Sequence, residues 1–352
     1  MKRWMTAKII VCSLAITLAR GPFAHAADEL LPKHVTPATL KAVRAGLDYL
    51  AKTQTSDGNW ANTPDSISYP VSMAALAGMA FLANGNTTTR GPYAENVRLT
   101  IEYLLSNVRS SGIITGSGEE YGRPMYGHGF STMFLACAYG METDARLREQ
   151  MKKAIEGAID LTARGQSSYG GWTYRPGDGD EGSVTVTQLQ ALRAAANAGF
   201  TVPKQTIEEA IRYLERCRGP EGGIVYSLGS GGGSRPAISA GALAAMYNAG
   251  EYNSDMSEKC LEYVGKQYKP ANGAFVNTGH DFYGHFYAAQ AFYQAGDEHF
   301  DEYFPAARDM FLKSQKKEDG AWDGDGIGPI YGTAVACITL QLPYKFLPIY
   351  QR

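Results

Sequence analysis

The sequence predicts an all-α protein built from six copies of a unit of two helices. One observation is a loop in which glycine precedes a large apolar residue, found complete at Gly58-Asn59-Trp60, Gly170-Gly171-Trp172 and Gly320-Ala321-Trp322. Degenerate copies end at Ile114, Ile224 and Phe275, so the six anchor residues lie 47 to 58 residues apart. The second observation is a regular alternation of two kinds of helix around these loops. A period repeated this often predicts an array of stacked units.

The helix before each loop is charged and amphipathic. Predicted helices of this kind span 36–54, 95–109, 144–166, 204–218, 256–268 and 303–315. In the first of them, an apolar stripe at helical spacing is formed by Leu40, Val43, Leu47 and Leu50. Such a helix packs one face against a core and turns the other to water, so these helices form an outer layer.

The helix after each loop carries almost no charge. Predicted helices of this kind span 70–84, 127–140, 183–199, 236–250, 282–296 and 329–342, and Arg193 is the only Lys, Arg, Asp or Glu among them. A helix that is apolar all round must be buried all round, and these are too short to cross a membrane. They therefore form an inner layer.

The first residues have the pattern of a secretory signal peptide. Lys2, Arg3 and Lys8 precede an apolar run over 9–19, and Ala24-His25-Ala26 supplies small residues for cleavage. We expect residues 1–26 to be removed near Ala26. The remaining domain, 27–352, would be exported to the periplasm or outside the cell without a stable membrane anchor.

Composition argues against nucleic acid as a partner, and cysteine placement argues against a zinc site. Hydrophobic residues make up 44% of the chain, charged residues 19%, and the formal net charge is −2, with no basic stripe for nucleic acid. The cysteines after the signal lie inside predicted helices: Cys137, Cys217, Cys260 and Cys337. This placement predicts buried free thiols rather than a zinc site, although an exported protein could pair two of them. The sequence predicts no cofactor and no metal, and leaves the oligomeric state open.

Two stretches carry a family resemblance. Residues Gln54 to Trp60 and Gln315 to Trp322 resemble the QW repeat of squalene cyclases. The chain after the signal is similar to the terpenoid cyclase and protein prenyltransferase family, in its squalene-hopene cyclase-like branch. The resemblance implies an (α/α)6 toroid, here single where squalene cyclases carry two. It also implies that glutamine and tryptophan brace neighbouring repeats, a structural role that suits an aromatic ring at a tight turn.

An acidic stretch precedes the third inner helix. Asp178, Asp180 and Glu181 resemble the acid motif of squalene-hopene cyclases, which implies that one of them protonates a terminal double bond. Clustered carboxylates suit that task, because like charges keep one of them protonated. Glu181 and the following Gly182-Ser183 depart from the family pattern. The alternative is a solvated loop at a helix start, with Ser183 as the cap.

A repeated tripeptide marks the starts of two inner helices. Tyr126-Gly127-His128 and Tyr283-Gly284-His285 belong to the second and fifth repeats, and Tyr331 takes the same place in the sixth. In a closed ring of six, the second and fifth repeats face each other. His128 and His285 could then transfer protons while the tyrosines hold a polar substrate. The alternative is that both residue types pack and hydrogen-bond locally.

Three functions follow, and fold alone does not choose among them. The first is a terpenoid or polyprenyl cyclase, an isomerase with an apolar lumen lined by aromatic residues such as Phe286. The second is a carbohydrate-active, polysaccharide lyase-like toroid in which Arg175 or Arg235 neutralises a uronate carboxylate. The third is a non-catalytic binding or scaffold toroid. Zinc-dependent protein prenylation is excluded, because the stretch after Arg235 has no Cys and no acid to complete a zinc site. The substrate, small molecule or polymer, stays open, as does catalysis itself.

Overall fold

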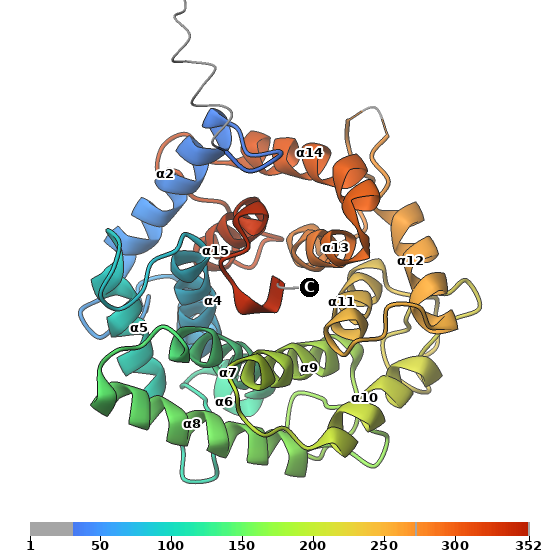
Figure 1. The fold of residues 1–352 in the computed structure, drawn as a ribbon, viewed down its shortest axis with the longest axis horizontal. Helices are drawn as coiled ribbons and strands as arrows, with labels where there is room; N and C mark the ends of the chain where they lie inside the picture. Colours follow the sequence, from blue (N-terminus) through green and yellow to red (C-terminus); the bar gives the residue numbers. More distant parts are fainter. Residues whose placement is uncertain (1–30, 272, 351–352) are drawn as a thin grey trace, which may run out of the picture.

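The computed structural model describes residues 31–271 and 273–350, and the expected signal peptide lies outside these ranges. An outer ring of helices surrounds an inner ring (Figure 1). The outer helices are α2 (Pro37–Thr53), α5 (Ala94–Ser106), α8 (Ala145–Arg164), α10 (Lys204–Arg216), α12 (Asp255–Gln267) and α14 (Asp297–Ser314). The inner helices are α4 (Pro70–Ala83), α7 (Met125–Tyr139), α9 (Gly182–Asn197), α11 (Pro236–Asn248), α13 (Asp281–Ala295) and α15 (Pro329–Leu340). Contacts of α14 and α15 with α2 close the ring, which confirms the predicted (α/α)6 toroid.

Burial separates the two layers as their sequences predict. Every residue of α4 is buried, whereas α10 buries only Thr206, Ala210, Tyr213 and Leu214. The outer helices differ from their predicted bounds by a few residues at most, except for α14, which begins at Asp297 rather than at 303 and continues through Pro305. A proline in a helix interior removes one backbone hydrogen bond, so it commonly marks a helix start. Here the helix continues on both sides of it.

Each complete Gly-x-Trp loop ties two neighbouring repeats together. Trp60 Nε1 donates to Leu50 O at 2.8 Å, and Gln54 Nε2 donates to Gly58 O and to Asn96 O of α5 at 3.1 and 3.2 Å. Gly58 has a φ of +83°, and a Cβ there would lie 2.1 Å from a backbone oxygen of α5. Only glycine allows that approach. Equivalent bonds brace the other two loops, so the tryptophans are structural.

Carboxylates from neighbouring loops cap several inner helices. Asp65 accepts hydrogen bonds from first-turn amides of α15, Glu120 from those of α4, and Asp325 from those of α13, all at 2.8–3.1 Å. Asp65 lies in the short helix α3 (Pro64–Ser68) and Glu120 in α6 (Glu119–Gly122). Helix N-termini attract anions through their free amides and dipole. The caps therefore join repeats at the end of the ring where the inner helices begin, which we call the mouth.

The C-terminal residues close the opposite end of the ring. After α15, the 3₁₀ turns η1 (Leu342–Tyr344) and η2 (Pro348–Tyr350) lead the chain to the centre of the ring (Figure 1). Leu347, Ile349 and Tyr350 are at most 1% exposed. Asn197, the last residue of α9, donates from Nδ2 to Pro348 O at 3.2 Å. The C-terminal segment therefore fills the lumen at the end opposite the mouth.

The four cysteines of the described ranges are buried and free, as predicted. Within the same ranges, no helix is long and apolar enough to cross a membrane.

Candidate functional site

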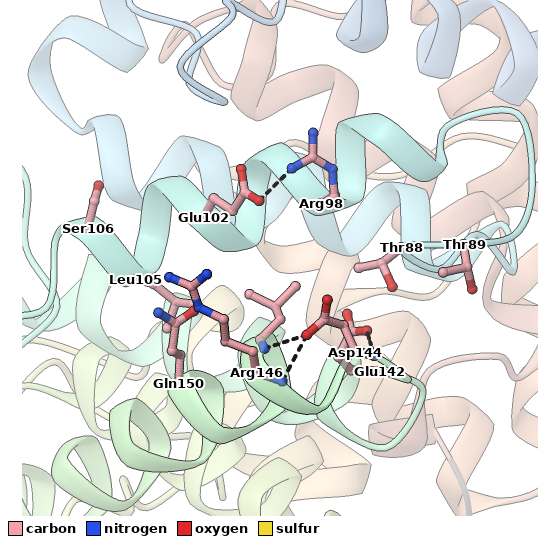
Figure 2. A pocket seen from close by; sticks show the side chains of 11 residues that line it. Thr88, Thr89, Arg98, Glu102, Leu105, Ser106, Glu142, Asp144, Arg146 and Gln150 are labelled. Atoms are coloured by element: carbon pink, nitrogen blue, oxygen red, sulfur yellow. Dashed lines mark hydrogen bonds and ion pairs between the residues drawn. The ribbon is translucent and has the colours of Figure 1, made fainter.

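Two open hollows lie on the outside of the ring. One, of about 660 Å³, lies between α5 and α8 (Figure 2), and another, of about 430 Å³, lies beside α8 near the end of α9. In the first, Arg98 pairs with Glu102, and Asp144 caps α8 through two backbone amides. These charged side chains already have partners on their own helices. A converging set of polar side chains is found instead at the mouth.

Tyr126, Ser183 and Glu181 form a hydrogen-bonded chain at the mouth. Tyr126 Oη, from α7, bonds to Ser183 Oγ in the first turn of α9. Ser183 Oγ in turn lies 2.7 Å from both carboxylate oxygens of Glu181. Glu181 also accepts from the amides of Ser183 and Val184, at 3.1 and 2.8 Å. Both the Tyr126 phenol and the Glu181 carboxylate are removed from water, and burial raises the pKa of each.

The predicted acidic cluster is divided among three environments. Burial raises the pKa of Glu181 above its usual range, although Ser183 and the two amides act in the opposite direction. Asp180 accepts from the amide of Leu228, in the next repeat's loop, at 2.8 Å. Asp178 is exposed. Glu181 is the acid that reaches the interior, because its backbone is extended (φ −159°) and neighbouring side chains then point apart.

The tyrosines of the two Tyr-Gly-His stretches come together. Tyr283 Oη donates to Ser183 O at 3.4 Å, and Ser183 is the residue that Tyr126 contacts. Burial, the neighbouring Tyr287 and Tyr126 raise the pKa of Tyr283. Tyr331 is also buried, and its hydroxyl reaches Asp325 at 3.4 Å. The second, third and fifth repeats thus meet at Ser183. A substrate-binding role for these tyrosines stays a prediction.

Below the tyrosines, the lumen is filled by polar side chains. Gln190 Nε2 of α9 donates to Gln290 Oε1 of α13 at 2.9 Å, although α11 separates these helices on the ring. Tyr287 and Tyr350 are at most 1% exposed, and the Tyr350 hydroxyl has no hydrogen-bond partner among the described residues. The interior therefore differs from the apolar lumen that the cyclase interpretation expects.

His128 and His285 lie between the two layers, which corrects the expectation that they face the lumen. His128 Nδ1 accepts from the amide of Ile114 at 3.2 Å, and its Nε2 lies 3.0 Å from Thr162 Oγ1 of α8. His285 Nδ1 lies 2.7 Å from Tyr303 Oη of α14. An α-helix turns by about 100° per residue, so residues two apart point to opposite sides. Because the tyrosines face the lumen, the histidines must face the outer helices.

The remaining predicted residues lie away from the Tyr126–Ser183–Glu181 chain. Arg175 is exposed and donates from Nε to Gly122 O at 2.8 Å, which braces the second repeat's loop. Arg235 is exposed at the start of α11. Phe286 is buried, with its ring edge-to-face against Tyr287 at 4.8 Å.

A group of loop residues that the sequence analysis missed lies beside Tyr126; we call Tyr69, Glu119, Arg123, Tyr174 and Tyr226 the tyrosine arc. Tyr69 Oη donates to Glu119 at 3.1 Å, and the hydroxyls of Tyr174 and Tyr226 are 2.7 Å apart. The Arg123 guanidinium lies 5.2 Å from the ring centre of Tyr174, which is 6.0 Å from that of Tyr126. These residues lie in the loops and short turns that precede inner helices. That shared position could have identified them from the sequence.

No protein-family model and no curated protein matches the chain. Solved structures do match its fold. One is an inactive variant of an alpha-1,6-mannanase of Salegentibacter sp. HEL1_6 in complex with alpha-1,6-mannotetrose, with a TM-score of 0.63, 11% identity, and coverage of 88% of this chain and 100% of that one. Another is cellobiose 2-epimerase from Spirochaeta thermophila, with a TM-score of 0.58, 12% identity and coverage of 89% and 99%. A type II terpene cyclase from Scytonema has a TM-score of 0.54, 14% identity and coverage of 88% and 98%. At these identities the similarity defines this chain as an α/α toroid and shows the fold alone.

Proposed function

We propose that this chain is a carbohydrate-active toroid that binds a saccharide at its mouth. The observation that supports this most strongly is the tyrosine arc. Phenol rings offer apolar faces on which sugar rings stack, and their hydroxyls bond to sugar hydroxyls. Glu119 and Arg123 add an acceptor and a cation beside those rings. Two of the similar structures, the mannanase and the epimerase, are named as acting on saccharides.

The polar interior favours a saccharide over a polyene. A polyprenyl cyclase needs an apolar cavity that holds a long hydrocarbon while cations migrate through it. Here Gln190, Gln290 and Tyr287 fill the lumen, and each is at most 1% exposed. We therefore place the saccharide above these residues, where the side chains of the tyrosine arc are phenolic and charged.

A binding experiment tests the proposal. Purified protein is titrated calorimetrically with a panel of neutral and acidic oligosaccharides, and with a geranylgeranyl compound as the polyene. We expect a saccharide to bind, and Tyr174→Ala and Tyr226→Ala each to weaken that binding about 10-fold, the loss of one stacking ring. The matched control is Tyr252→Ala, which removes another exposed tyrosine from the loop after α11, at the opposite end of the ring.

Two results would reject the proposal. One is an absence of saccharide binding across the panel. The other is binding that Tyr252→Ala weakens as much as Tyr174→Ala does. Turnover of the polyene without saccharide binding would favour the cyclase interpretation instead.

A further inference from the structure

The hollow between α5 and α8 contains two polar oxygens without a partner. Glu142 is 5% exposed, and its Oε2 is closed to water and has no hydrogen-bond partner among the described residues. Thr88 Oγ1 likewise has neither water nor a partner there. Both residues line this hollow of about 660 Å³ (Figure 2). A carboxylate oxygen that meets neither water nor a donor is unfavourable unless a cation or a proton neutralises it.

Two acids of the hollow each keep one carboxylate oxygen available. Glu142 Oε1 accepts from the Asp144 amide at 2.7 Å, and Asp144 Oδ1 accepts from the amides of Arg146 and Leu147 at 2.8 and 2.9 Å. These bonds hold both carboxyl groups in place and leave Oε2 of Glu142 and Oδ2 of Asp144 available. Figure 2 shows both carboxylates pointing toward the loop that carries Thr88. The acids therefore present their second oxygens on one side of the hollow.

The charge of the hollow also favours a cation. Its lining includes one more carboxylate than guanidinium, namely Glu102, Glu142 and Asp144 against Arg98 and Arg146. Arg98 pairs with Glu102 on its own helix. In the described part of the chain, neither Glu142 nor Asp144 takes part in a salt bridge. The negative charge beside the partnerless Oε2 is therefore not neutralised by a protein side chain.

We propose that Glu142, Asp144 and Thr88 bind a calcium ion in this hollow. Calcium takes about six to eight oxygen ligands in a flexible arrangement, whereas magnesium demands a near-ideal octahedron. Oxygens that come from two separate loops suit the more flexible ion. Two carboxylates and one hydroxyl are few ligands, so water completes the coordination from the open side of the hollow. We expect a Kd of about 0.1–1 mM, in the range of weak calcium sites.

The ion links two neighbouring repeats at the end of the ring opposite the mouth. Thr88 belongs to the loop between α4 and α5, and Glu142 and Asp144 belong to the turn between α7 and α8. Bound calcium supplies the partner that Glu142 lacks and holds the Thr88 loop against the start of α8. Its role is structural. The inference does not depend on the proposed saccharide site, which lies at the other end of the ring.

Calorimetric titration of calcium-free protein with calcium chloride and with magnesium chloride tests the site. We expect one equivalent of calcium to bind. Glu142→Gln should weaken this binding at least about 10-fold, because an amide nitrogen replaces Oε2 and a charge is lost. Thr88→Val, which removes a neutral ligand, should weaken it by a smaller factor. The matched control is Glu102→Gln: this carboxylate lines the same hollow but already pairs with Arg98, so calcium affinity should not change.

Thermal melts give a second measurement with an expected change of order. In EGTA, Glu142→Gln should melt at or above the temperature of the wild type, because the partnerless buried charge is gone. At about 10 mM calcium the wild type should gain about 2–5 °C and the variant none, so the wild type becomes the more stable protein. Hydrogen exchange in the Thr88 loop should slow with calcium in the wild type only.

Several results would overturn the site. These are an absence of calcium binding at about 10 mM, and binding that Glu142→Gln and Glu102→Gln weaken equally. Magnesium binding as tight as calcium binding would overturn the choice of ion. A Glu142→Gln protein that is more stable than the wild type in both buffers would show that Glu142 is buried as a neutral acid. If Glu142→Gln does not fold, unchanged calcium affinity in Thr88→Val rejects the site. Saccharide binding at the mouth is a separate measurement that none of these results alters.

Discussion

Two buried tyrosine hydroxyls differ in whether they have a partner. Tyr303 Oη lies 2.7 Å from His285 Nδ1, whereas Tyr350 Oη has no partner among the described residues. Leaving a buried polar group unpaired costs free energy, and removing it can be neutral or stabilising. We therefore expect Tyr350→Phe to keep the free energy of unfolding or raise it by up to about 1 kcal/mol, and Tyr303→Phe to lower it by about 1 kcal/mol. Urea unfolding of both variants measures the difference, and equal losses would show that Tyr350 has a partner after all.

The buried histidines make stability depend on pH. Burial lowers the pKa of His128 from 6.5 to about 4 and that of His285 to about 3. The unfolded chain takes up these protons near pH 6.5, and the folded chain only near the lowered values. The stabilisation that comes from neutral imidazoles is therefore complete above pH 6.5 and is lost as the pH falls toward 4 and then 3, by up to about 1.4 kcal/mol per pH unit for each histidine.

A variant isolates the contribution of one histidine. His128→Gln keeps an acceptor for the Ile114 amide but cannot titrate, so its melting temperature should fall less steeply than that of the wild type between pH 6.5 and 4. Calorimetric melts across this range measure it. The buried carboxyls of Glu120 and Glu181 titrate in both proteins, so they cancel in the comparison. Identical slopes would assign the acid sensitivity elsewhere.

At the scale of elements, the carboxylate caps join helices that are distant in sequence. Asp65 receives the amides of Ile330 and Tyr331 at 2.9 and 3.0 Å, which ties the first repeat to the last. Asp65→Ala should lower the free energy of unfolding by about 1–3 kcal/mol, because buried amides lose their acceptor. Hydrogen exchange should also become faster at these two amides. Asp57→Ala, which removes an exposed loop acid eight residues earlier in the chain, is the control and should change neither. Unchanged protection in Asp65→Ala would mean that α15 starts without its cap.

The helices and their braces were predictable from the sequence, whereas the caps and the tyrosine arc were not. The uncharged inner helices and the Gln54–Trp60 stretch carry local patterns, and the structure confirms both. The Asp65 cap depends on closure of the ring, which brings it against an amide 265 residues away. The arc likewise joins loops of different repeats, so no local pattern contains it. The position of the histidines could have been predicted from the sequence. His128 and His285 each follow a tyrosine by two residues on the same helix, so a histidine cannot face the lumen if its tyrosine does.

At the scale of the molecule, the C-terminal segment completes the core. Leu347, Ile349 and Tyr350 are buried among the ends of the inner helices. A chain that stops at Tyr344 should lose at least about 3 kcal/mol of unfolding free energy, since three large side chains no longer leave water. Its helical circular dichroism should persist. Phe346→Ala is the matched control: this residue of the same segment is 50% exposed and should cost less than about 0.5 kcal/mol. Equal stability of the shortened chain and the wild type would show that the segment only rests on the ring.

Because the C-terminal segment fills one end of the ring, the toroid is open only at the mouth. A polymer cannot be drawn through a ring whose far opening is filled by Ile349 and Tyr350. Whatever reaches Tyr126 must arrive and depart over the same rim. A long ligand would therefore have to lie across the rim or enter by one of its ends.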